Sequence, residues 1–258
     1  MPAIDFSHAV AAFGAAFVAG AINSVAGGGT LVTFPTLIWL GLPSVAANAT
    51  STVAIWPGSL GAMWGYRREL ASSDPRMLAL VIPSLVGGIA GALLLRLTPD
   101  SVFDELVPFL ILFATLLFMA QEPIQRQIKT ADPAAGPRSR RWLVGAMLFQ
   151  LLVALYGGYF GAGIGILMLA ALGFFGLTDI HQMNGLKNFF AICINGVAAL
   201  YFMWAKMVYW PDVIIMAIGA VAGGYGGAGL ARRMGRVAVR RIVIFIGFAM
   251  ALSLFVKH

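Results

Sequence analysis

The chain has 258 residues, of which 60% are hydrophobic and only 10% are charged, and its mean hydropathy is +0.89. Soluble domains carry about 25% charged residues, so this composition excludes an ordinary globular protein and indicates an integral membrane protein. The net charge of +7 comes largely from basic clusters at 67–76, 126–141 and 232–241, which is typical of cytoplasmic loops and does not predict a nucleic-acid partner.

Uncharged runs long enough to cross a bilayer recur along the chain. No Asp, Glu, Lys or Arg lies between Asp5 and Arg67, and 142–178 is another such run. A helical span needs about 20 mostly apolar residues, whereas a membrane strand would alternate apolar and polar residues. We therefore predict helices at 6–25, 29–42, 45–66, 76–97, 104–120, 142–160, 163–177, 181–205, 211–231 and 237–256.

Two of these predicted helices, 29–42 and 163–177, are too short to cross a bilayer upright. At 1.5 Å per residue the first measures about 21 Å, less than the roughly 30 Å of the hydrocarbon core. Each could form a re-entrant hairpin with the helix before it or cross as a short tilted span. The number of full crossings therefore stays open.

A polar stretch divides the chain into two membrane repeats. Residues 121–141, QEPIQRQIKTADPAAGPRSRR, have no apolar period and contain Pro, Gly, Arg and Lys. Such a composition predicts an exposed, basic cytoplasmic linker. It separates an N-terminal repeat, 1–120, from a C-terminal repeat, 142–258.

The two halves align with each other. A shift of 136 residues places Asn48 on Asn184, and a shift of 134 places Gly27–Gly29 on Gly161–Gly163. The charges at equivalent corners have opposite sign, because Asp100, Asp104 and Glu105 fall on Arg236, Arg240 and Arg241.

Since basic loops stay cytoplasmic, equivalent loops must lie on opposite faces of the membrane. This predicts an all-α integral membrane protein of two inverted five-segment repeats, with broken or re-entrant short helices at the centre. Loops 67–76, 121–141 and 232–241 would be inside, whereas loops 98–104 and 206–212 and both termini would be outside.

Glycine clusters interrupt both repeats and predict a binding site. Gly27, Gly28 and Gly29 precede Thr30, and Gly161 and Gly163 open the equivalent short helix. A helix that starts there presents unpaired N–H groups and a partial positive charge, which suits an oxyanion. With inverted repeats the two breaks can converge near the midplane. The alternative is that these glycines only allow close helix packing, which we favour for Gly87/Gly91 and Gly223/Gly227.

Polar side chains follow each break. A lysine inside an apolar helix costs about 2.5–3.5 kcal/mol by insertion scales, so Lys187 is the candidate for the cation that selects an anion. It could instead lie at the interface with its ammonium in water. The remaining polar residues could bind anion oxygens or simply bond across helices. These candidates are Asn23, Asn48, Ser51, Thr52, Asn184 and Asn188.

These motifs carry a resemblance that covers nearly the whole chain. Gly27-Gly28-Gly29-Thr30 with Pro35, the block Ala47–Ser51, and Gly161–Gly165 resemble the sulfite exporter TauE/SafE family of membrane transporters. The resemblance implies transport of a small sulfur-containing anion such as sulfite or a sulfonate. The second half departs from the first, since no proline follows Gly165 in the short helix.

We therefore expect a secondary transporter that moves a small anion across the cytoplasmic (inner) membrane, as a multi-pass protein working by alternating access. The alternatives are an anion channel or a permease for an unrelated small solute. A membrane-embedded enzyme is disfavoured, because His8, His181 and His258 are scattered and HExxH and GxSxG are absent.

No cofactor, metal or catalytic residue is expected, and the partners are the substrate anion and the lipid bilayer. Asp179 and His181 could couple transport to protons, although an N-cap role for Asp179 is the alternative that we favour. The coupling ion, proton or sodium, and the oligomeric state stay open.

Overall fold

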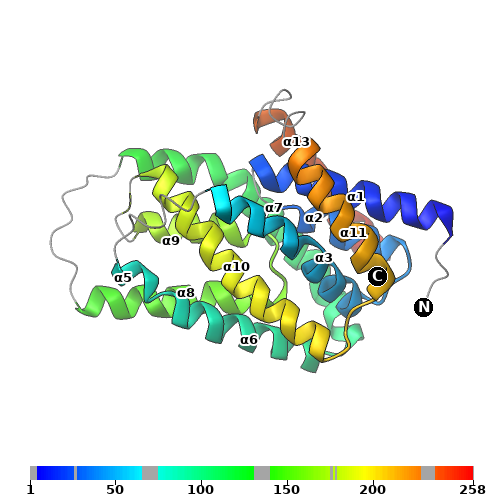
Figure 1. The fold of residues 1–258 in the computed structure, drawn as a ribbon, viewed down its shortest axis with the longest axis horizontal. Helices are drawn as coiled ribbons and strands as arrows, with labels where there is room; N and C mark the ends of the chain where they lie inside the picture. Colours follow the sequence, from blue (N-terminus) through cyan, green and yellow to red (C-terminus); the bar gives the residue numbers. More distant parts are fainter. Residues whose placement is uncertain are drawn as a thin grey trace.

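The computed structural model describes residues 5–25, 28–65, 75–130, 140–174, 177, 179–227 and 236–257, and these residues are helical with short connections (Figure 1). No strand occurs among them. The elements are α1 (Phe6–Val25), α2 (Thr30–Trp39), α3 (Ser44–Gly65), α5 (Pro75–Leu78), α6 (Val81–Leu97), α7 (Asp100–Thr130), α8 (Arg140–Tyr159), α9 (Ile164–Phe174), α10 (Ile180–Trp204), α11 (Trp210–Ala222), the π-helical turn η1 (Gly223–Gly227) and α13 (Arg236–Lys257).

The prediction of an all-helical chain is confirmed, and most predicted ends lie within two residues of the observed ones. The predicted helix 76–97 is wrong in its continuity, because a turn at Ala79 and Leu80 separates α5 from α6. Pro83 accounts for this turn, since it has no N–H to donate to the carbonyl of Ala79. The predicted helix 211–231 ends as α11 at Ala222, where the glycine-rich η1 follows.

The exposed loop predicted at 121–141 is also wrong in its first part. α7 continues as a helix to Thr130, and α8 already begins at Arg140. Gln, Glu, Arg and Lys make up six of the ten residues at 121–130 and are good helix formers, so a polar composition here marks a helix outside the apolar region. Residues 131–139 lie outside the described residues, as do 67–74 and 232–235 of the other two basic loops. The predicted loop 232–241 is wrong in its second part, because 236–241 already belong to α13.

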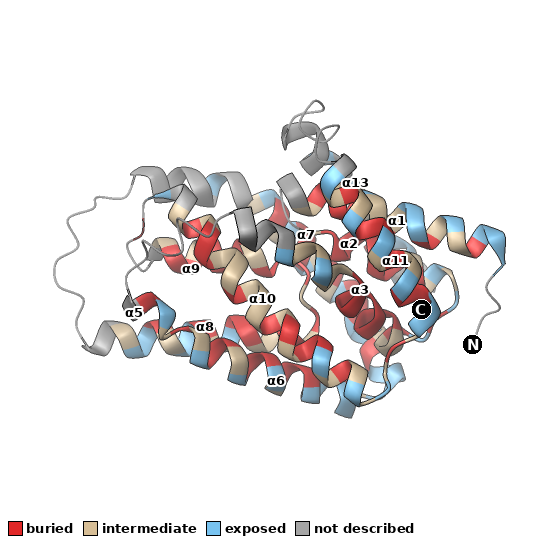
Figure 2. Ribbon diagram, viewed as in Figure 1, coloured by how far each residue is buried: buried red, intermediate tan, exposed pale blue. Residues whose placement is uncertain are grey.

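The arrangement of polarity is that of a membrane protein. On α6 the side chains of Ile82, Val86 and Leu93 are exposed, whereas Gly87 and Gly91 face the interior (Figure 2). A soluble helix would show the opposite pattern. Three stretches, 6–23, 100–120 and 182–204, are long and apolar enough to cross a membrane by length and composition. Shorter apolar helices occupy 30–39, 81–97, 143–159, 164–173, 210–225 and 243–253.

The contacts between helices come in pairs. α1 packs along α11, and their counterparts under the sequence alignment, α8 and α6, lie side by side in the same way (Figure 1). α3 contacts α11 as α10 contacts α6, and α2 contacts α13 as α9 contacts α7. The remaining large contacts, α3 with α10 and α7 with α13, join equivalent helices of the two halves. The short helices α2 and α9 lie within this framework.

Candidate functional site

The first break lies between α1 and α2. Gly28 has a φ of +94°, which L-residues with side chains rarely adopt, so glycine is required there. The N–H of Gly29, the residue that precedes α2, donates to Asn23 Oδ1 at 2.7 Å, so the Asn23 amide satisfies a backbone donor at the break. A Cβ on Gly29 would lie 2.8 Å from the carbonyl oxygen of Ala19, so this glycine also permits close packing. Thr30 is buried, and Gly27 lies outside the described residues.

The second break, between α8 and α9, contains two glycines in the left-handed region. Gly161 and Gly163 have φ values of +79° and +77°. The hydroxyl of Tyr156 donates to the carbonyl oxygen of Ala162 at 2.6 Å, which fixes the connection between them. A Cβ on Gly161 would lie 3.7 Å from Asn195 Oδ1 on α10. An amide therefore faces this break as well.

Both breaks border the same turn of α7. A Cβ on Gly28 would overlap the ring of Phe118, and a Cβ on Gly163 would lie 3.4 Å from Leu117 Cδ1 and 3.6 Å from Ala114 Cα. Ala114 to Phe118 is one helical turn, about 6 Å of rise. The breaks of the two halves are thus brought to one level of the molecule.

Lys187 belongs to α10, and its side chain packs against the start of α9. Its side-chain stem passes across Gly165, where a Cβ would lie 3.3 Å from Lys187 Cδ. Within the described part of the chain, no hydrogen bond or ion pair joins its ammonium group to a partner. A cation and a helix N-terminus are both positive, so their proximity favours an anion between them.

The polar face of α3 contacts the rims of both breaks. Asn48 Nδ2 donates to the carbonyl oxygen of Tyr159 at 2.8 Å, two residues before Gly161. Ser51 Oγ lies 2.6 Å from Thr33 Oγ1 on α2, and Thr52 Oγ1 donates to the Asn48 carbonyl oxygen at 3.0 Å. All these α3 side chains are buried. The polar side chains of α3 therefore do form hydrogen bonds between helices. One acceptor stays without a partner, because Asn48 Oδ1 is buried and accepts no hydrogen bond from any described residue.

The equivalent face of α10 is less enclosed. Asn184 and Asn188 are half-buried, and Asn184 takes part in an interaction. Asp179 directly precedes α10 and its carbonyl oxygen accepts the N–H of Met183 at 2.9 Å, which is the N-cap position. The His181 side chain lies outside the described residues.

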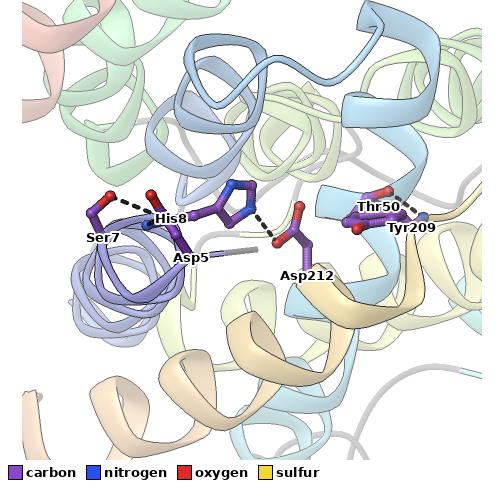
Figure 3. Close-up of polar contacts among 6 residues, drawn as sticks. All are labelled: Asp5, Ser7, His8, Thr50, Tyr209 and Asp212. Carbon is purple, nitrogen blue, oxygen red and sulfur yellow. Dashed lines mark hydrogen bonds and ion pairs between the residues drawn. The ribbon is translucent and has the colours of Figure 1, made fainter. Parts of the chain in front are cut away.

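The sequence interpretation missed a buried pair far from these breaks. His8 Nε2 lies 2.7 Å from Asp212 Oδ1, with the side chains 6% and 0% exposed (Figure 3). The only sequence signal is an acid and an imidazole at the ends of two uncharged runs. Because 204 residues separate the two, no local pattern joins them. Among the described residues, no group of three His, Cys, Asp or Glu side chains could hold a metal ion.

Comparisons with known proteins agree with this architecture. The family model described as Sulfite exporter TauE/SafE matches residues 12–254. A "Probable membrane transporter protein" of Haemophilus influenzae is 28% identical over 91% of this chain and 89% of its own length. ORF9 of Sinorhizobium (27%, 94% and 90%) and YfcA of Escherichia coli K12 (26%, 94% and 87%) carry the same description. No solved structure matches the chain.

Proposed function

Because the chain belongs to the sulfite exporter TauE/SafE family of membrane transporters, we propose that it is a secondary transporter for a small sulfur-containing anion. Sulfite, a sulfonate or a similar oxyanion would cross the cytoplasmic membrane by alternating access. The names of the relatives support membrane transport and specify no substrate. The substrate class is therefore argued from the site.

The paired contacts support an inverted repeat as the basis of alternating access. Each contact that α1, α2, α3, α6 or α7 makes with the second half has a counterpart under exchange of the halves. Transporters built this way place substrate where the two repeats meet, at broken helices near the bilayer midplane. Both glycine breaks border one turn of α7, so the two breaks lie close enough together to serve one site.

The observation that carries the proposal is the position of Lys187. Its stem lies across Gly165 at the opening of α9, and the half-buried amides of Asn184 and Asn188 stand on the same helix, α10. An unpaired ammonium beside a helix N-terminus favours a compact anion, whose charge would compensate both. Hydroxyl and amide donors would replace the water around its oxygens.

The test is uptake of radiolabelled sulfite into proteoliposomes, with ethanesulfonate as a second probe. We expect saturable flux and counterflow in the wild type, and loss of both in Lys187→Ala. Lys206→Ala is the matched control, because Lys206 is an exposed lysine between α10 and α11 and should leave flux unchanged. Flux without counterflow would indicate a channel, and unchanged flux in Lys187→Ala would remove Lys187 from the site.

A further inference from the structure

The His8–Asp212 pair closes one end of the contact between α1 and α11. Both side chains are buried, and His8 Nε2 lies 2.7 Å from Asp212 Oδ1 (Figure 3). The second carboxylate oxygen, Oδ2, is buried and has no partner among the described residues. A group that only fastened two helices would have both oxygens satisfied, because an unpaired buried acceptor is costly.

The surroundings contain nothing that would balance a change of charge. α2 and α3, which pack on these helices, carry no charged or titratable side chain in their described parts, and η1 contributes only the exposed Tyr225. On their own elements the neighbours are Tyr209 and Asp5. Asp5 is exposed, and the hydrogen bond from the His8 N–H lowers its pKa, so it stays ionised near neutral pH. The net charge of the buried pair is therefore set by whether the pair itself holds a proton, and not by a neighbouring group.

Histidine is the residue type that exchanges its proton most readily near neutral pH. With a neutral imidazole and an ionised carboxylate the pair carries one negative charge, and one proton added to the imidazole makes it neutral overall. A neutral pair is easier to keep buried than a single charge. Gain of a proton would hold α1 against α11, and its loss would favour their separation.

Hydrogen bonds, together with short stretches of α11 and α3 backbone, connect the start of α11 near Asp212 to the first break. The N–H of Tyr209, three residues before Asp212, donates to Thr50 Oγ1 on α3 at 3.0 Å (Figure 3). The next residue along α3, Ser51, lies 2.6 Å from Thr33 Oγ1 of α2. Thr33 Oγ1 in turn donates to the Gly29 carbonyl oxygen at 3.3 Å.

We propose that His8 and Asp212 form the proton-binding site through which the transport cycle is coupled to a proton gradient. The inference rests on the proposed transport function for its coupling role, but the binding of a proton at this pair can be measured without any substrate. It replaces Asp179 and His181 as the candidate for coupling.

The transport experiment compares counterflow with accumulation driven by an imposed pH gradient. Ethanesulfonate is the probe, because its sulfonate stays ionised at every pH used and the gradient cannot act on it directly. In the wild type we expect both activities. In Asp212→Asn we expect counterflow to persist and gradient-driven accumulation to be lost. Asp5→Asn is the matched control, since it removes an exposed acid three residues from His8 and should keep both. A wild type that shows counterflow but ignores the gradient would overturn the inference while leaving the proposed function intact.

A second variant, His8→Gln, keeps a side-chain donor toward Asp212 and covers the case in which Asp212→Asn fails to fold. It should show the same separation of counterflow from accumulation. Gradient-driven accumulation that survives in His8→Gln would overturn the inference.

Proton binding is read directly by NMR of protein labelled with ¹⁵N at its three histidines, in nanodiscs, with His8→Gln to assign the signal. The pH is varied over the range in which the transport assays are run, and a His8 signal that changes with pH supports the inference. A His8 signal that stays constant over that range identifies a structural pair and overturns the inference. This measurement separates proton binding from the proposed transport function, because the His8 signal can be followed even if neither sulfite nor ethanesulfonate is transported.

Discussion

The contact between α1 and α11 and the contact between α6 and α8 share a backbone arrangement but differ in their polar content. Glycines bring the helices together in both: a Cβ on Gly219 would lie 2.6 Å from the Phe13 carbonyl oxygen, and one on Gly87 would lie 2.7 Å from that of Leu151. The first contact also buries His8 and Asp212, whereas the buried groups described in the second are neutral, with Gln150 Nε2 donating to Ser84 Oγ at 2.8 Å.

The comparison shows how a repeated framework acquires different functions. Small residues set the distance between helices in both halves, because close approach in lipid depends on packing rather than on hydrophobic burial. The polar pair at each contact can then change without disturbing the framework. Under the proposal above, the first contact responds to protons, whereas the second, whose described buried groups are neutral, does not. Four substitutions test this division.

Gly91→Leu should have the largest effect. A Cβ at this position would overlap the backbone at Leu155, which cannot move aside without separating α6 from α8. We expect destabilisation by more than about 3 kcal/mol and loss of folded protein. Thermal unfolding in detergent measures the effect. Gly145→Leu on α8 is the control, since nothing lies within 4 Å of its Cβ position, and it should behave as wild type. A folded, stable Gly91→Leu protein would contradict the packing role.

His8→Ala should come next. The substitution leaves the Asp212 carboxylate buried without its partner, which costs about 3–5 kcal/mol in comparable cases. Thermal unfolding at several pH values is the measurement. The loss should depend on pH, because the buried group left without its partner is a carboxylate. A loss that does not vary with pH would mean that the missing ring volume matters more than the charge.

Ser84→Ala breaks the neutral pair of the other contact. Gln150 then loses the acceptor of its amide hydrogens in a buried position, so we expect a cost of about 1–3 kcal/mol. Unlike the effect of His8→Ala, this cost should be the same at every pH tested. A pH-dependent loss in Ser84→Ala would weaken the distinction between the two contacts.

Thr50→Val should have the smallest effect. It removes the acceptor for the Tyr209 N–H while keeping the shape of the side chain, and a neutral hydrogen bond contributes about 0.5–1.5 kcal/mol. Sensitivity of ethanesulfonate uptake to the pH gradient should fall more than stability does, because this bond joins the end of α11 to α3. An unchanged response to the gradient would show that coupling takes another route.

The helices could largely be predicted, because the length of an uncharged apolar run can be read directly from the sequence. The breaks at Gly28 and Gly163 could be predicted as well, since runs of glycine interrupt apolar helices in both halves. The helical stretch 121–130 could not, because composition alone does not separate a polar helix from a loop. The turn at Ala79 and Leu80 does have a local signal, Pro83, which the predicted continuous helix 76–97 did not take into account.

Site residues divide in the same way. The sequence indicates Asn23 because it precedes the glycines. Its hydrogen bond with the Gly29 N–H depends on the three-dimensional path of the chain, which the sequence does not give. Lys187 stood out because a charge in an apolar helix is conspicuous. The pairing of His8 with Asp212 depends on how helices of opposite halves pack, and no sequence period records that packing.

α7 is longer than the hydrocarbon core of a bilayer is thick. Its 31 residues measure about 46 Å at 1.5 Å each, or about 43 Å along the membrane normal at an average tilt of 20°. The hydrocarbon core is about 30 Å thick, and the apolar part of the helix ends at Ala120. The ten residues after Ala120 therefore extend α7 beyond an apolar segment that by itself measures about 31 Å, and the turn that borders the two glycine breaks lies within six residues of that boundary.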